Sequence, residues 1–111
     1  MRMAAVQMVS TPEVSRNLDA ARRLVAQAAA EGAALVALPE YFCLLGQHER
    51  DKIALAETPG DGTIQRALSG MARESGVWLI GGTLPLRIAG DADRALNACC
   101  VYAPDGSLAA R

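Results

Sequence analysis

The stretch AALVALPEYF, residues 33–42, decides how this chain folds. It begins as an apolar run without alternation, which is typical of a strand covered on both faces in a parallel sheet. The run ends at Pro39, which has no backbone N–H to give a neighbouring strand, so the strand is predicted to span residues 33–39. Glu40 then leaves the sheet at the carboxyl end of this strand. In open parallel sheets that end faces a crevice in which reactive groups gather.

The segments before this stretch predict the same class of fold. Residues 1–9 are short and mostly apolar, and they are followed by Ser10, Thr11 and Pro12, which end a strand and can begin a helix. Residues 15–31 carry apolar side chains at steps of three and four, as one face of a helix does. Strand, helix and strand in this order imply a right-handed crossover between parallel strands.

The segments after it continue the alternation. HERDKIALAE, residues 48–57, predicts a short helix, and a second helical pattern begins at Ile64 and closes at Gly76. VWLIGG, residues 77–82, predicts a third buried strand, in which Trp78 is expected to belong to the core.

The C-terminal segment predicts a hairpin. ALNACCVYAP, residues 95–104, is expected to form a fourth strand, and PDG at 104–106 is a turn signal, because proline presets one backbone angle and glycine accepts a positive φ. A return strand has barely begun at residues 107–111. A hairpin cut short there would leave backbone groups unpaired, so we expect the chain to be the N-terminal portion of something longer.

The composition bounds the class of protein. A chain of 111 residues is about one domain, and 51% hydrophobic with 21% charged residues is typical of a globular protein. Eleven basic and twelve acidic residues, mixed along the chain, disfavour a nucleic-acid partner. No apolar run is long enough to span a membrane and no signal peptide is evident, so a cytoplasmic location is expected. Three cysteines, an odd number, favour reduced thiols.

Glu40 is the candidate catalytic residue. The strand behind it carries Leu35, Val36 and Leu38, so its carboxylate is expected to have low-dielectric material on one side, which suits a general base. The alternative is that Glu40 is a helix cap or a surface acid at the exit of the strand.

The order of motifs resembles the opening of the nitrilase superfamily, the carbon-nitrogen hydrolases. The match runs over essentially the whole chain: AAVQM, the amphipathic helix, ALVALPEYF, PGDGTIQRALSGMARESGVWLIGGT and LNACCVYAPDG. The LPE motif with an aromatic residue two positions on is its most specific part. LPEYFCLLG is most similar to the bacterial amidase branch, which includes deaminated-glutathione amidases and omega-amidases.

The resemblance implies a fold and a chemistry. The fold is an α/β protein, a nitrilase-type α-β-β-α sandwich, of which residues 1–111 form the N-terminal half, with about four strands and two main helices. The family uses a glutamate as general base, a lysine that stabilises charge, and a cysteine that attacks a nitrile or amide carbon. By motif, Glu40 corresponds to the glutamate. The lysine and cysteine motifs lie beyond the PDG turn in the family and are missing from this chain.

Other candidate residues are weaker. Lys52, the only lysine, is expected on a solvated face, and Cys43 is expected to pack beside its apolar neighbours. Cys99 and Cys100 fall mid-strand, pointing to opposite faces. His48 is the only histidine, so the helical zinc motif that it begins lacks its second ligand. No metal or other cofactor is implied, because thiol chemistry with a local base needs none.

The sequence thus predicts part of an enzyme that hydrolyses a small non-peptide amide or nitrile. One alternative is a non-catalytic fragment or interaction module with the half-fold, and another is a flavodoxin-like nucleotide-binding module, although the phosphate loop is lacking. The resemblance implies a homo-oligomer. It also implies that one face of the sheet is an exposed apolar surface, and we expect the chain by itself to be inactive.

Overall fold

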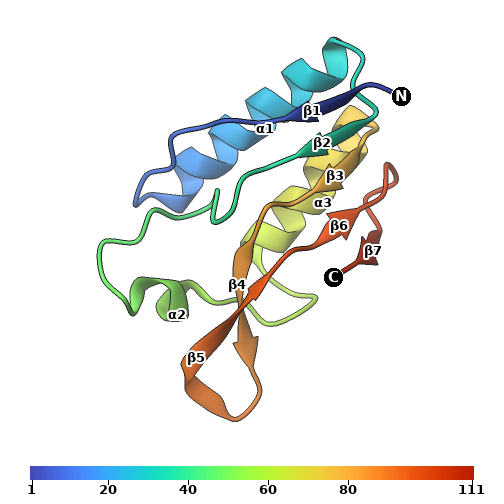
Figure 1. The fold of residues 1–111 in the computed structure, drawn as a ribbon. Coiled ribbons are helices and arrows are strands. Elements are labelled where there is room, and N and C mark those ends of the chain that lie inside the picture. The colour runs from blue at the N-terminus through green and yellow to red at the C-terminus, as the bar shows by residue number, and fades with distance from the viewer.

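The computed structural model describes residues 1–111 and places two long helices behind a sheet (Figure 1). The helices are α1 (Val14–Ala30), α2 (Asp51–Leu55) and α3 (Thr63–Ser75). The strands are β1 (Met3–Ala5), β2 (Leu35–Ala37), β3 (Trp78–Ile80), β4 (Leu84–Ile88), β5 (Asp91–Ala98), β6 (Val101–Tyr102) and β7 (Leu108–Ala110). The three helices that the sequence predicts are all present. None of them combines the length and the apolar character that crossing a bilayer requires.

Five strands form the main sheet, in the order β1-β2-β3-β6-β7. The first three are parallel, as the strand–helix–strand alternation predicts, whereas β6 and β7 are antiparallel to their neighbours. The register puts Ala4, Val36, Leu79 and Tyr102 in one row across the sheet. The expected return strand is β7, and residues 104–106 lie in the turn before it.

This arrangement excludes the flavodoxin-like alternative. A doubly wound nucleotide-binding fold carries helices on both faces of a mostly parallel sheet. Here α1 and α3 contact each other and lie on the same side of the sheet, and two antiparallel strands follow the parallel ones (Figure 1).

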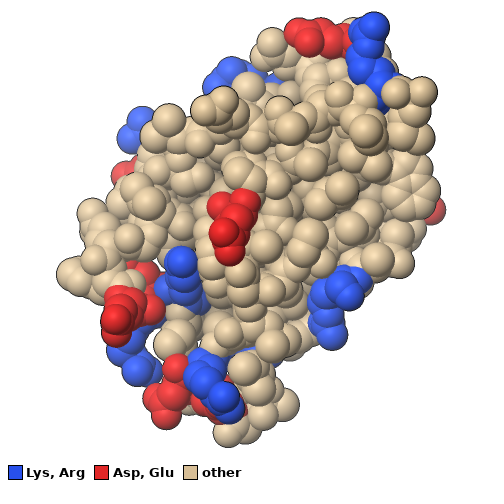
Figure 2. Space-filling model, viewed as in Figure 1, with Lys and Arg blue, Asp and Glu red and all other residues tan.

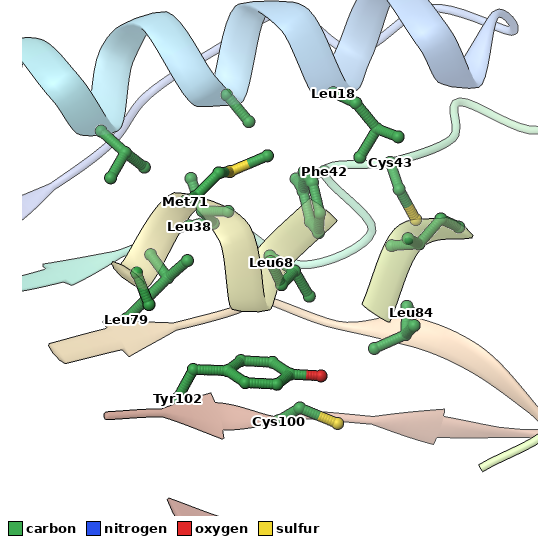
Figure 3. Packing of buried hydrophobic residues seen from close by; sticks show 14 of the residues in the cluster. Leu18, Leu38, Phe42, Cys43, Leu68, Met71, Leu79, Leu84, Cys100 and Tyr102 are labelled. Carbon is green, nitrogen blue, oxygen red and sulfur yellow. The ribbon is translucent and has the colours of Figure 1, made fainter. Parts of the chain in front are cut away.

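The core lies between the long helices and the face of the sheet that they cover. Val36, Leu79 and Tyr102 are buried there together with Leu68 of α3. Figure 3 shows Leu68, Leu79 and Tyr102 packed close together. α3 ends at Gly76, whose φ of +64° is the left-handed conformation that closes helices.

The opposite face of the main sheet is apolar and uncovered. Two rows of side chains cross it: Met3, Leu35 and Trp78, and then Ala5, Ala37, Ile80 and Val101. Figure 2 shows this side of the molecule, which is largely free of charged groups where β1, β2, β3 and β6 lie. The expectation that Trp78 is a core residue is wrong, because alternate residues of β3 point away from the helices and Trp78 is 41% exposed. Contiguous apolar surface of this kind marks an interaction site.

The expected fourth strand at residues 95–104 is in fact two strands. β5 pairs with β4 in a separate antiparallel hairpin, and only β6 joins the main sheet. Cys99 and Cys100 therefore lie in the connection between strands and not mid-strand. The hairpin is hidden in the sequence because β4 contains Pro85, which cannot donate a ladder hydrogen bond and so argues against a strand.

Candidate functional site

Glu40 lies just beyond the carboxyl end of β2, where strand pairing stops. The N–H of Leu38 donates to the carbonyl of Ile80 at 2.9 Å, the last such bond before Pro39. The chain then turns back on itself, and the N–H of Phe42 donates to the carbonyl of Pro39 at 3.2 Å. The turn therefore presents Glu40 beyond the ends of the parallel strands.

The segment that follows β3 supports this turn. The N–H of Tyr41 donates to Oγ1 of Thr83 at 2.9 Å, and Tyr41 has a φ of 45°, which residues other than glycine rarely adopt. Gly82 has a φ of +60° and lies so close to Pro39 that only a residue without a Cβ fits. Strained backbone of this kind persists where the surrounding structure holds it, and it clusters at functional sites.

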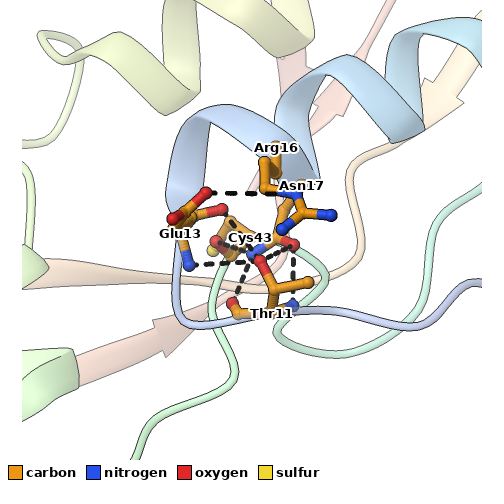
Figure 4. Close-up of polar contacts among 5 residues, drawn as sticks. All are labelled: Thr11, Glu13, Arg16, Asn17 and Cys43. Atoms are coloured by element: carbon orange, nitrogen blue, oxygen red, sulfur yellow. Dashed lines mark hydrogen bonds and ion pairs between the residues drawn. The ribbon is translucent and has the colours of Figure 1, made fainter.

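The buried side chain of Asn17 links the segment that follows the turn to α1. The Asn17 amide donates to the carbonyl oxygens of Thr11 at 2.7 Å and Cys43 at 2.8 Å, and its Oδ1 accepts the N–H of Thr11 (Figure 4). An exposed ion pair between Arg16 and Glu13 lies beside this network. Because both ends of the Asn17 amide are bonded, burying it costs little and fixes Cys43 relative to the helix.

The Glu40 carboxylate is exposed and holds one hydrogen bond from another part of the chain. Its Oε1 accepts a bond from Nδ2 of Asn97, near the end of β5, at 2.9 Å. The strand behind Glu40 is buried at Val36 and Leu38, as expected, whereas Leu35 is only half-buried and the carboxylate itself faces water. Sequence reasoning missed Asn97 because it lies 57 residues away, in a strand whose pairing with β4 the sequence did not predict.

Glu40 lines a cleft of about 770 Å³. Its walls are formed by residues 8–10 after β1, the turn at residues 39–41, the loop at residues 44–49 and Lys52. This volume falls among those of small-molecule sites, which are about 300 to 1,000 Å³. The cleft is open to solvent and can admit a small polar molecule to the carboxylate.

Lys52 stands in the wall of this cleft, where its side chain is partly covered and still meets solvent. Its Nζ lies 3.6 Å from the centre of the Tyr41 ring, a cation–π contact, and its side chain is half-buried without an ion pair. Burial, followed by the nearby Cys43 and Glu40 side chains, raises the pKa of the Tyr41 phenol. The loop between Glu40 and α2 folds back to make this contact, which no local sequence pattern reveals.

None of the cysteines has the surroundings of an activated thiol beside Glu40. Cys43 packs in the core, as expected, and burial raises the pKa of its thiol to about 12. Burial also raises the pKa of Cys100. Cys99 is exposed but does not line the cleft. His48 does line it, and no group of three or more potential metal ligands is close enough to hold an ion. Nucleophilic cysteines have a lowered pKa, the opposite of what burial produces here.

Two relatives of known activity match almost the whole chain. It is 37% identical over 107 residues to the omega-amidase of Xenopus tropicalis, covering 96% of this chain and 37% of that protein. It is 38% identical over 108 residues to the deaminated glutathione amidase of Synechocystis sp., covering 97% of this chain and 39% of that protein. The chain thus spans less than half the length of either relative.

Solved structures show the same fold. The NitFhit protein of C. elegans matches with a TM-score of 0.86 and 28% identity, over 97% of this chain and 26% of that one. An amidase from Nesterenkonia sp. matches with a TM-score of 0.79 and 24% identity, over 99% of this chain and 41% of that one. The α/β fold is therefore the N-terminal half of the nitrilase-type sandwich. The profile of the carbon-nitrogen hydrolases matches residues 2–111, and the chain belongs to that family.

Proposed function

We propose that residues 1–111 supply the general base of an enzyme that hydrolyses a small non-peptide amide or nitrile, and that this base is Glu40. The observation that carries the proposal is the position of Glu40, which lines a cleft of about 770 Å³ beyond the carboxyl ends of the parallel strands β1 and β2. The amidase activity of the relatives supports the choice of reaction.

The proposed reaction needs a thiol and a cation beside Glu40. The carboxylate takes the proton of the thiol, the sulfur bonds to the amide carbon, and a lysine stabilises the negative oxygen that forms. Collapse of this intermediate breaks the C–N bond, and the amine leaves with the proton that Glu40 held. A water molecule, deprotonated by the same carboxylate, then hydrolyses the thioester to the acid and restores the thiol.

The lysine and the cysteine are proposed to come from outside residues 1–111. Cys43 is buried with a raised pKa, and Lys52 is held against the Tyr41 ring, so neither meets the needs of these roles. The uncovered apolar face supports the same view, because the second sheet of a complete sandwich would cover it. We propose accordingly that residues 1–111 are the N-terminal part of one hydrolase domain, and that the complete domain forms a homo-oligomer.

A hybrid enzyme tests the proposal. Residues 1–111 replace the matching segment of the Synechocystis amidase, and hydrolysis of a simple omega-amide is measured after circular dichroism has established folding. We expect activity in the hybrid and none in residues 1–111 alone. Glu40→Gln should reduce kcat by on the order of 10²- to 10⁴-fold, the contribution of a general base. Glu31→Gln, at the exposed end of α1, is the control. A folded hybrid whose activity survives Glu40→Gln would refute the assignment.

A further inference from the structure

The β4–β5 hairpin reaches Glu40 from both of its ends. Gly82 and Thr83, directly before β4, contact the backbone on either side of Glu40 through Pro39 and Tyr41. Asn97, near the end of β5, bonds to the Glu40 carboxylate. One supersecondary unit thus holds both the backbone and the side chain of this residue.

The register of the hairpin determines where Asn97 stands. Asn97 pairs with Pro85, and the next pair along the ladder, Leu84 with Ala98, is buried in the core. Because neighbouring residues of a strand point to opposite faces, Asn97 is exposed while Ala98 is buried, and the Asn97 side chain reaches the Glu40 carboxylate. A slip of one residue would exchange the two faces and remove the contact with Glu40.

The hydrogen bond from Asn97 makes the two oxygens of the Glu40 carboxylate different from each other. Oε1 accepts the Asn97 amide at 2.9 Å, while Oε2 has no hydrogen-bond partner in the protein. A free carboxylate on an exposed side chain samples several rotamers, and ordering it in advance of a reaction contributes to the rate. An amide is a neutral donor, so it orients the carboxylate without forming an ion pair that would neutralise its charge.

We propose that Asn97 is a positioning residue for Glu40, holding Oε1 so that Oε2 faces the cleft as the oxygen that accepts the proton. This inference rests on the proposed function, in which Glu40 is the base. In this role Asn97 acts on the reaction only through the glutamate.

The chain contains only two asparagines, Asn17 and Asn97, so Asn17 serves as the internal reference in a spectroscopic test of Asn97. The NMR signals of the Asn97 side-chain amide are compared with those of Asn17, which is buried and bonded to backbone carbonyls. In Glu40→Gln the charged acceptor becomes neutral, so the bonded Asn97 proton should move upfield while the Asn17 signals stay in place. In the control Glu31→Gln neither pair of signals should move.

The converse variant tests positioning itself. In the unchanged chain the Hα–Hβ couplings of Glu40 should report one dominant rotamer, and in Asn97→Asp they should become averaged, because a donor is replaced by a like charge. The matched control is Gln27→Glu, which puts a second carboxylate beside Glu31 on α1 and should leave Glu40 unchanged. The inference is overturned if the Asn97 amide signals stay in place in Glu40→Gln, or if the Glu40 couplings stay unchanged in Asn97→Asp. Neither result depends on turnover, so the role of Glu40 as base stands or falls separately in the hybrid enzyme.

Discussion

The Cα of Gly82 packs directly against the carbonyl group of Pro39, so closely that a Cβ at Gly82 would stand 2.1 Å from the Pro39 oxygen. The obstacle is backbone and not the end of a flexible side chain, so it cannot move aside without moving the turn. This contact is where the segment after β3 meets the turn that carries Glu40. Because Gly82 has no side chain, the two segments can approach this closely, and their contact fixes the turn that carries Glu40.

Gly82→Ala should destabilise the fold and displace Glu40. The alanine must adopt a φ of +60° and must also push Pro39 away. The conformation costs about 1 to 2 kcal/mol and the overlap about 1 to 3 kcal/mol, so the free energy of unfolding in urea should fall by about 2 to 5 kcal/mol.

Gly90→Ala is the matched control for this change. Gly90 also has a positive φ, +77°, but no atom lies within 4 Å of the position that its Cβ would occupy. It should lose only the conformational part, about 1 to 2 kcal/mol. Equal losses in the two variants would show that the contact with Pro39 carries no weight.

Glu57→Gln should weaken the start of α3. The Glu57 carboxylate accepts the backbone N–H groups of Ile64 at 2.6 Å and Gln65 at 3.1 Å, both unpaired within the helix. A glutamine turns one of these acceptors into a donor, so we expect a loss of about 1 to 3 kcal/mol in urea unfolding. Glu74→Gln, which breaks an exposed ion pair with Arg22, should cost at most about 1 kcal/mol. A loss in Glu57→Gln no larger than that in Glu74→Gln would contradict this view of the cap.

The sequence predicted the elements whose pattern is local. The run at residues 33–39 indicated the parallel strand β2, although only one of its faces is covered and not both, and the helical spacing of residues 15–31 matches α1 closely. The turn at residues 104–106 was also evident, because proline and glycine act on their own backbone angles. These patterns can be read from the sequence because the residues that form them are neighbours along the chain.

The parts that were missed depend on contacts between distant segments. The β4–β5 hairpin was hidden by Pro85, and without it nothing could bring Asn97 to Glu40. Lys52 is a charged residue in a polar segment, so the sequence indicates only a surface position. The loop before α2 folds back and places its ammonium group on the Tyr41 ring. Trp78 was assigned to the core because an apolar strand does not reveal which of its faces is covered.

Trp78→Lys should reduce self-association of the isolated chain. Trp78 lies in the apolar row with Met3 and Leu35 on the uncovered face, and stacking two such faces would remove them from water. We expect the unchanged chain to form larger species as its concentration rises in sedimentation velocity, and the variant to remain smaller. Leu96→Lys is the control, because Leu96 is 45% exposed but lies in the hairpin. A monomeric unchanged chain at every concentration, or an equal effect of both variants, would contradict the prediction.

The Cys43 thiol should make the fold sensitive to high pH. Burial raises the pKa of Cys43 from 9.0 to about 12 in the folded chain, whereas the unfolded chain exposes the thiol and ionises it near its ordinary value. The unfolded state therefore binds fewer protons between these two values. Below about pH 9 the contribution to stability is complete, and it is lost as the pH rises toward about 12.

Each pH unit in this window should cost about 1.4 kcal/mol per such group. Burial also raises the pKa of Tyr102 to about 12, so the unchanged chain should lose stability through both groups. Urea unfolding between about pH 9 and 11, in the presence of a reductant, measures the slope. Cys43→Ala should be less stable at neutral pH because of the cavity, yet show a shallower loss at high pH, because one titrating group is gone. Cys99→Ala, at an exposed position, should keep the original slope. Parallel slopes in all three proteins would mean that the buried thiol is ionised as readily as a free one.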